Sequence, residues 1–227
     1  MLLMMLEKGM QVDEIIFCDT GKEYPQTYEH IIKVGLYIRE KYGKEITILK
    51  AEKDFDYWFS EHIKTTGKHK GKKGYGWATM SIRWCTSHLK VKIVNNYLAT
   101  HKEPYQLFIG IAYDEPKRIH EHQYPLYDWG ITEAEALEYC YSKGFDWGGL
   151  YERFERVSCW CCPLQCLDDL RALRKYYPEL WQELREMDKR ANGVKFKADY
   201  TVEQLEERFR LEEEDEQQRD RSGSICR

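Results

Sequence analysis

Cysteines are the residues of this sequence best suited to chemistry. Four of the eight cysteines lie within eight consecutive positions, from Cys159 to Cys166. Cys159 and Cys162 form a C-x-x-C pair, and a tight turn at that spacing brings two sulfurs to one point, as a thiolate-bound metal requires. A further ligand must come from elsewhere, and Cys85 in an Arg-Trp-Cys-Thr segment is the best candidate. We therefore predict a four-cysteine site formed by Cys85, Cys159, Cys162 and Cys166, with iron–sulfur favoured over zinc.

The cellular compartment decides how these cysteines are interpreted. No N-terminal stretch has the pattern of a secretory signal, and the apolar run Met1–Leu6 is too short to cross a bilayer, so we expect a cytoplasmic protein without a membrane partner. In a reducing compartment, clustered cysteines are metal ligands or redox groups before they are disulfides. A redox dithiol at Cys159 and Cys162 is the competing hypothesis, and it predicts no bound metal. Cys140 fits a helix core, and Cys226 an inert tail thiol.

The first half of the chain alternates between helix and strand patterns. The sequence predicts a helix over 1–10, a strand over 15–18, a helix over 24–42 closed by Gly43 and a strand over 46–49. Such an order implies parallel strands joined by right-handed crossovers. A further buried strand is predicted over 106–111, followed by an extended segment over 124–129. The 227 residues, 42% of them hydrophobic, suffice for a large α/β domain or a domain with a small lobe.

Helices dominate the predictions for the remaining segments. They are expected over 55–63, over 86–98, from a capping box at Thr132 and Glu135 to about Lys143, and from Leu167 to Ala191. Residues 199–220 hold ten acids and three arginines, which predicts an exposed acidic helix with a disordered tail.

One segment is strongly basic, although the net charge of −4 excludes no class of partner. Between Glu61 and Lys92 there are eight Lys or Arg and one acid, and residues 64–77 have the composition of a loop. Clustered cations attract phosphates, so this loop over residues 64–92 is either a solvated surface or a face for phosphate or nucleic acid.

Three segments stand out by their order and spacing. They are Phe17-Cys18-Asp19-Thr20-Gly21 with Tyr24-Pro25-Gln26-Thr27, Gly110-Ile111-Ala112-Tyr113-Asp114-Glu115 with Arg118, and Tyr124-Pro125-Leu126-Tyr127-Asp128-Trp129. In this order they resemble motifs of the phosphoadenosine-phosphosulfate reductase family, within the PP-loop adenine-nucleotide α-hydrolase superfamily. The resemblance covers about Met1 to Cys166, and the cysteine segment resembles the iron–sulfur-bearing branch of the family.

The resemblance implies an adenine-nucleotide site at the carboxyl edge of a parallel sheet. It implies that the nucleotide, ATP or an adenylyl sulfate, contacts the strand end, that two cations lie near its phosphate or sulfate, and that a second loop forms the opposite rim. Cations in such a place stabilise negative charge as a bond breaks. The implied residues are Asp19, Thr20 and Gly21 at the strand end, Arg83 and Lys90 as cations, and Gly110, Asp114, Glu115 and Arg118 at the rim.

The sequence also departs from the family pattern. The phosphate loop Ser-Gly-Gly-x-Asp-Ser has no counterpart, and the chain begins inside the helix that this loop precedes. We therefore expect the loop and its strand to lie upstream or to be missing from this copy, and enzymatic activity to depend on them. Ala112 replaces the family's Arg, and no Glu-Cys-Gly-x-His motif is present. These departures favour sulfur transfer or nucleotide activation over straight sulfonucleotide reduction.

Together these observations predict an α/β fold with a Rossmann-like parallel sheet, helices on both faces and a small helical Cys-rich C-terminal lobe. The predicted parts are a nucleotide-binding domain (1–130, lacking the first strand and phosphate loop), a Cys-rich metal-binding lobe (131–198) and an acidic helix with a flexible tail (199–227). The expected function is adenine-nucleotide-dependent sulfur transfer or sulfonucleotide-reductase-like chemistry with a 4Fe–4S cluster, served by an electron- or sulfur-donor protein. The alternative is a non-catalytic nucleotide- or nucleic-acid-binding module with a structural four-cysteine zinc site.

Overall fold

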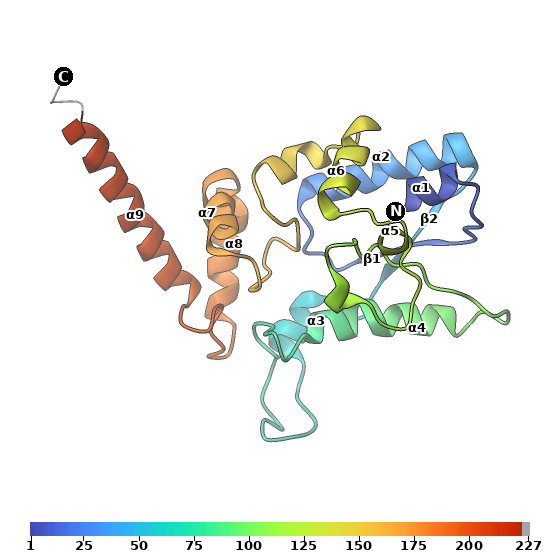
Figure 1. Cartoon of the computed structure of the whole chain (residues 1–227). Coiled ribbons are helices and arrows are strands. Elements are labelled where there is room, and N and C mark those ends of the chain that lie inside the picture. Colours follow the sequence, from blue (N-terminus) through green and yellow to red (C-terminus); the bar gives the residue numbers. More distant parts are fainter. Residues whose placement is uncertain (224–227) are drawn as a thin grey trace. The chain divides into compact units, whose positions relative to one another are not determined.

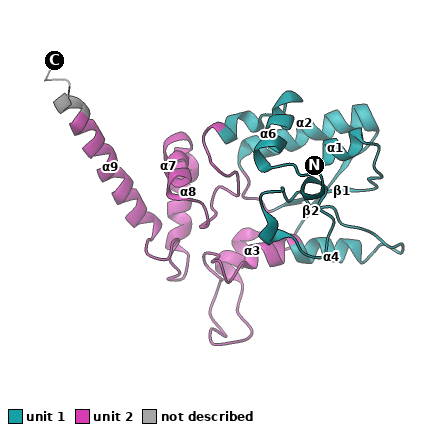
Figure 2. Cartoon of the chain, in the orientation of Figure 1, with its two compact units in different colours: residues 1–19, 24–50, 91–151 teal, residues 20–23, 51–90, 152–227 magenta. Residues whose placement is uncertain are grey.

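The computed structural model describes the backbone of residues 1–223 and the side chains of residues 1–219. The predictions for Cys226 and for the end of the tail lie outside the described residues. Contacts divide the chain into two compact units, coloured in Figure 2. Unit 1 comprises residues 1–19, 24–50 and 91–151, and unit 2 comprises residues 20–23, 51–90 and the chain from 152 onward. The predicted three-part division into 1–130, 131–198 and 199–227 concerns function and stays a prediction.

Unit 1 contains a parallel pair of strands, β1 (Ile15–Asp19) and β2 (Ile46–Lys50), in register from Ile15 opposite Ile46 to Asp19 opposite Lys50. Helix α2 (Pro25–Tyr42) forms the crossover between them. Pro25 opens α2 at a position where a missing N–H costs nothing, and Gly43, with φ of 63°, ends it in the left-handed conformation. The parallel pair with its helical crossover makes the fold α/β, as the alternation predicted.

Helices lie on both sides of this strand pair. Helix α1 (Leu2–Glu7) packs with α2 and α6 (Glu133–Ser142) in a core around Leu3, Leu6, Ile38 and Phe145, and strand residues Ile15 and Ile46 pack against this core. Helix α4 (Lys92–Leu98) contacts β2, and Figure 1 shows it on the side opposite α2. The predicted capping box is present: Thr132 Oγ1 accepts from the Glu135 N–H, and Glu135 accepts from the Thr132 N–H.

Two predicted elements of unit 1 are wrong. Residues 106–111 form no strand: Phe108 makes only an isolated parallel bridge with Gln123, because a helix begins at Pro125, two residues after Gln123. Residues 124–129 are not extended but contain helix α5 (Pro125–Asp128), because Pro125 has the fixed φ of a first helical residue and the Asp128 N–H closes the turn on Tyr124 O at 3.0 Å. A short 3-10 helix, Pro116–Arg118, lies between them, and another, Trp147–Glu152, follows α6.

Unit 2 is mainly helical. Its elements are the π-helix Tyr57–Glu61, α3 (Trp84–Thr86), a π-helical turn Ser87–Val91 that continues into α4, α7 (Leu167–Tyr176), α8 (Pro178–Lys189) and α9 (Val202–Gly223). Helix α8 packs against both α7 and α9, and the buried side chains Leu173, Leu184 and Leu205 come from all three.

The acidic helix α9 is anchored more firmly than its composition suggests. Its apolar residues Val202, Leu205 and Phe209 are buried. Its glutamates pair with arginines of α7 and α8, Glu206 with Arg174 at 3.0 Å and Glu203 with Arg185 at 2.9 Å among them. None of the helices in the described part of the chain is long and apolar enough to cross a membrane.

Unit 1 has a histidine whose environment predicts acid sensitivity. The His30 ring on α2 stacks on Trp147 with centroids 4.1 Å apart, and burial, followed by the charge of Lys33, lowers its pKa from 6.5 to about 4. Between pH 6.5 and 4 the unfolded state therefore binds more protons than the folded state, and stability falls as the pH drops through this window. Because the ring is only partly buried, we expect a loss of about 1–2 kcal/mol.

Urea denaturation at pH 7 and at pH 4.5 measures this effect. The His30→Phe variant keeps a ring on Trp147 without a titrating group, so the histidine's share of the acid loss should disappear. His122→Phe, at an exposed position, should retain the wild-type pH dependence. An unchanged pH dependence in His30→Phe would contradict the assignment.

Candidate thiol-rich site in unit 2

The cysteine segment folds into the predicted tight turn. The Cys162 N–H donates to Cys159 O at 3.0 Å, and the Gln165 N–H donates to Cys162 O at 3.3 Å. The buried amide of Gln165 closes the turn from inside, because its Nε2 donates to the carbonyls of Cys159 and Trp160, each at 3.0 Å. Trp160 and Cys161 are buried, so the turn is part of the core of unit 2.

Cys166 begins a helix. It is the N-cap of α7, and its Sγ accepts the Asp169 N–H at 3.3 Å. Asp169 is itself buried and accepts the Glu155 N–H at 2.8 Å. Lys197 donates to Gln165 O and lies within electrostatic range of both Cys162 and Cys166.

Cys85, from α3, lies in the neighbourhood of the turn. Burial raises the pKa of the Cys85 thiol, and the nearby Cys162 raises it further. Burial likewise raises the pKa of Cys161 well above its usual value, with added contributions from Cys159, Cys162 and Cys85. Three of the four predicted ligands, Cys85, Cys159 and Cys162, therefore lie near enough to Cys161 to raise the pKa of its thiol.

The donor chemistry of this region fits a thiolate-bound metal, since several sulfurs gather in a mostly buried place. The positions of these side chains fit a metal site less well than their chemistry does. Among residues 1–219, no group of three or more His, Cys, Asp or Glu side chains is arranged so that it could hold a metal ion. None of the seven cysteines of this part of the chain forms a disulfide. The residues thus match a four-cysteine centre in type and not in arrangement.

The loop that follows β1 belongs to unit 2 and contacts the first cysteine of the turn. Three groups meet at one oxygen, Glu23 Oε1: it accepts from the Thr20 hydroxyl at 3.0 Å and from the Cys159 thiol at 3.3 Å, and Lys90 Nζ lies 3.8 Å away. Thr20 Oγ1 is also 3.6 Å from Cys159 Sγ. Burial, and then the charge of Glu23, raises the pKa of Cys159 to about 12. Cys159 in this arrangement is a protonated thiol at neutral pH.

Lys22, in the same loop, is buried and anchors the loop through its side chain and its backbone. Its side chain is only 8% exposed, and Nζ lies 3.0 Å from Asp56 and 3.1 Å from Glu183. The ammonium also lies over the rings of Phe55 and Trp160, while Lys22 O accepts the Trp160 N–H at 3.0 Å. Burial alone would lower the pKa of Lys22, yet the two carboxylates together hold it above its usual value. Lys22 therefore holds the loop against the cysteine turn.

The predicted nucleotide residues divide between the units. In unit 2, Thr20 contacts Cys159, and Gly21 adopts a φ of 74° that suits glycine. Lys90 pairs with Glu23, and Arg83 is exposed at the N-cap of α3. In this unit, the structure brings Thr20 and Lys90 together at Glu23.

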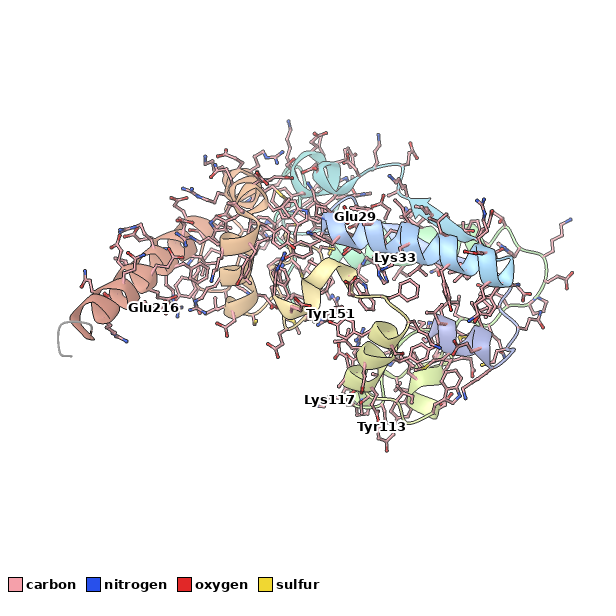
Figure 3. The ribbon with its side chains drawn as sticks, turned by 90° about the horizontal axis from the view of Figure 1, so that it is seen from above. Glu29, Lys33, Tyr113, Lys117, Tyr151 and Glu216 are labelled. Atoms are coloured by element: carbon pink, nitrogen blue, oxygen red, sulfur yellow. The ribbon has the colours of Figure 1, made fainter. Side chains whose placement is uncertain are left out.

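In unit 1, the predicted residues are engaged separately. Asp19 accepts the Tyr28 hydroxyl at 2.8 Å and pairs with Lys50 at 2.8 Å. Asp114 accepts the N–H of Glu133, the first residue of α6, at 3.1 Å, and Glu115 pairs with Arg118 at 2.5 Å. Figure 3 shows Tyr113 and Lys117 of this segment at the periphery of unit 1, and both are exposed. Gly110 lies beside Met1, and a Cβ at position 110 would meet the Met1 side chain in ordinary van der Waals contact, at 3.8 Å.

Sequence reasoning missed Lys22, Glu23, Asp56 and Glu183. A strand end followed by Asp-Thr-Gly-Lys-Glu signals that polar groups leave the sheet edge together, so Glu23 belonged to a recognisable segment. The burial of Lys22 has no such signal, because its two carboxylate partners lie 34 and 161 positions away.

Comparison with known proteins finds two similar proteins of Methanocaldococcus jannaschii, both uncharacterized. MJ0973 is 26% identical over 191 residues, which cover 78% of this chain and 42% of the relative. MJ0066 is 25% identical over 191 residues, covering 77% of this chain and 35% of the relative. The chain thus spans less than half the length of either. No family model and no solved structure matches the chain.

Proposed function

We propose that this chain takes part in adenine-nucleotide-dependent sulfur transfer or sulfonucleotide-reductase-like chemistry. One observation supports the proposal above all: in unit 2, the loop after β1 lies against the first cysteine of the turn, with Cys159 Sγ 3.3 Å from Glu23 Oε1. The end of a parallel strand is where α/β proteins bind nucleotides. A thiol beside such a loop would offer a sulfur nucleophile to a bound nucleotide or to its product.

The chemical roles proposed for the chain's own residues follow from their contacts. Glu23 accepts a hydrogen bond from the Cys159 thiol and, together with burial, keeps this thiol protonated. The sulfur therefore stays a weak nucleophile until a ligand displaces the Glu23 carboxylate. Lys90 stands beside Glu23 and offers its ammonium to a phosphate or sulfate that enters here. Arg83, exposed at the start of α3, is a second cation in the same unit. Asp19, at the end of β1, is proposed to contact the nucleotide.

We further propose that the strand pair of unit 1 belongs to a larger Rossmann-like sheet. Helices on both faces of β1 and β2 support this. We also propose that Cys85, Cys159, Cys162 and Cys166 hold a 4Fe–4S cluster, with Cys159 losing its proton when the metal binds, because soft thiolates suit iron–sulfur clusters and the Cys159–Cys162 turn is formed. Such a cluster, when bound, would supply electrons or sulfur.

A zinc-bound, non-catalytic module is the second candidate. It is favoured by the burial of Trp160 and Cys161, because a turn that forms part of a core suits a metal that braces the fold. A zinc-bound sample would be colourless, whereas an iron–sulfur protein absorbs broadly in the visible range.

A single experiment with two variants tests the proposal. The chain is purified without oxygen, its iron, sulfide and zinc are measured, and its affinities for ATP and adenylyl sulfate are determined by calorimetry. Cys162→Ser should lose the metal and keep the nucleotide affinity. Asp19→Asn should keep the metal and bind nucleotide at least about tenfold more weakly, equivalent to about 1.4 kcal/mol.

Matched controls keep the result interpretable. Cys140→Ser removes a half-buried thiol of α6 in unit 1, and Asp13→Asn removes an exposed carboxylate before β1. Both should behave like the wild type. A wild-type protein without metal and without measurable nucleotide affinity would refute the proposed function. Zinc in place of iron, with nucleotide binding retained, would favour the binding module.

A further inference from the structure

We propose that unit 2 has a binding surface for single-stranded nucleic acid, formed by a basic loop (residues 64–73) and an aromatic stack at its base. This inference goes beyond the proposed function, because it uses none of the cysteines and none of the residues assigned to the nucleotide. It rests on three independent features of the described chain: unpaired lysines, half-buried stacked rings and exposed apolar side chains in one segment.

The basic loop is an ordered hairpin. Its ends are tied by an antiparallel bridge between Ile63 and Lys73, by the Lys64 N–H donating to Lys72 O at 3.0 Å, and by the Gly71 N–H donating to Lys64 O at 2.8 Å. Figure 1 shows this segment projecting away from the helices of its unit. The cations of the loop are therefore displayed on a defined frame.

The exposed lysines of the loop have no acidic partners. No acid occurs between residues 62 and 92. Within the part of the chain whose side chains are described, Lys68, Lys70, Lys72 and Lys73 are exposed and make no ion pair, whereas Arg174 and Arg185 elsewhere in unit 2 each pair with glutamates. Unpaired exposed cations in one place create a positive potential that attracts phosphates.

Aromatic rings lie in a stack at the base of the loop. Trp58 stacks on His88 with centroids 3.9 Å apart and planes 10° apart, and His62 stacks on Tyr75 at 5.3 Å and 20°. Tyr75 also stacks, at 5.9 Å, on the buried Trp84. Lys64 Nζ lies 5.4 Å from the centre of the Tyr75 ring, which joins the loop to the stack. Trp58, His62, Tyr75 and His88 are half-buried, so each of these residues keeps some surface exposed to solvent.

Exposed apolar side chains flank the same segment. Ile63, Met80 and Ile82 are 55%, 79% and 58% exposed. A lysine loop that served only to be solvated would not require exposed apolar side chains. The bases of a single strand have apolar faces that can pack against such side chains. The segment thus presents cations for a phosphate backbone together with rings and apolar groups for bases, which is how proteins hold single strands.

The same features argue against the other polyanions. A duplex hides its base faces, so the rings would have nothing to stack on, and inorganic polyphosphate has no bases at all. A single-stranded nucleic acid uses both halves of the surface.

Binding of a fluorescent 15-nucleotide single strand, followed by anisotropy over a range of salt concentrations, tests the inference. We expect measurable affinity at low salt and a linear fall of log affinity with log salt. The triple variant Lys68→Gln, Lys70→Gln, Lys72→Gln should bind at least about tenfold more weakly, with a salt slope smaller by about 2, because each lost phosphate contact removes about 0.7 from the slope. The control triple Lys44→Gln, Lys102→Gln, Lys195→Gln changes the net charge equally and should match the wild type.

The aromatic half has its own test. Tyr75→Leu, checked for folding by circular dichroism, should weaken binding severalfold and leave the salt slope unchanged, because stacking involves no counterion release. The Asp19→Asn and Cys162→Ser variants should bind the strand like the wild type, which separates this inference from the proposed function. It is overturned if the loop triple keeps the wild-type affinity and slope, if a duplex of the same length binds equally well, or if polyphosphate competes as strongly as the single strand.

Discussion

Gly74→Ala is expected to destabilise unit 2 by more than about 3 kcal/mol, because it combines left-handed strain with a backbone clash. Gly74 has a φ of 61°, which side-chain-bearing residues rarely adopt. A Cβ there would lie 2.2 Å from Phe59 O and 2.7 Å from Ser60 Cα. Both are backbone atoms next to the buried Phe59 ring, so neither can move cheaply. The free energy of unfolding in urea measures the loss.

Gly67→Ala is the matched control for this substitution. Gly67 is also left-handed, with a φ of 73°, but a built Cβ has no neighbour within 4 Å. Gly67→Ala should lower the free energy of unfolding by only about 1 kcal/mol, because it adds backbone strain without a clash. If the two variants lose equal stability, the close approach of residue 74 to the Phe59 backbone is not what requires glycine there.

Lys22→Met is expected to lower the stability of unit 2 by about 2–3 kcal/mol. Removing one partner of a buried ion pair typically costs about 3–5 kcal/mol, because the remaining charge is left without compensation. Here the cost is smaller, since Asp56 and Glu183 are 39% and 48% exposed and water can solvate them. Methionine keeps most of the packing between Phe55 and Trp160, so the loss reports on charge. Urea unfolding measures it.

An exposed ion pair provides the comparison. Lys189 pairs with Glu186 at 2.7 Å on α8 in the same unit, and the two side chains are 66% and 51% exposed. Lys189→Met should therefore change stability by less than about 1 kcal/mol. A Lys22→Met variant as stable as Lys189→Met would mean that Lys22 does not hold the loop against the cysteine turn.

The sequence was most informative where one element determines its own geometry. Gly43 and the pair Thr132–Glu135 mark helix ends by local chemistry, and the structure confirms both. The C-x-x-C turn is also a local feature, because Cys159 and Cys162 are separated by only two residues and the hydrogen bond that closes the turn joins these two cysteines. The helix–strand alternation also predicted the parallel pairing of β1 with β2.

Predictions that depended on partners far along the chain were less successful. An apolar run such as 106–111 becomes a strand only if another strand runs beside it, and Gln123 supplies a single bridge. The positions of Lys22 and Glu23 depend on Asp56, Glu183 and Cys159, which no local pattern connects to them. The metal ligands and nucleotide contacts remain predictions for the same reason: each joins segments whose meeting is decided by the whole fold.

The interleaving of the two units has a practical consequence for anyone who wishes to study one alone. The chain passes from one unit to the other after residues 19, 23, 50, 90 and 151. Neither unit is a contiguous stretch, so no single truncation can isolate it, and a protease that cuts at one of these passages leaves each half with an incomplete interior. Expression of residues 152 onward by themselves should yield helices without Lys22 and Asp56. The cysteine turn would then lack the loop against which it packs.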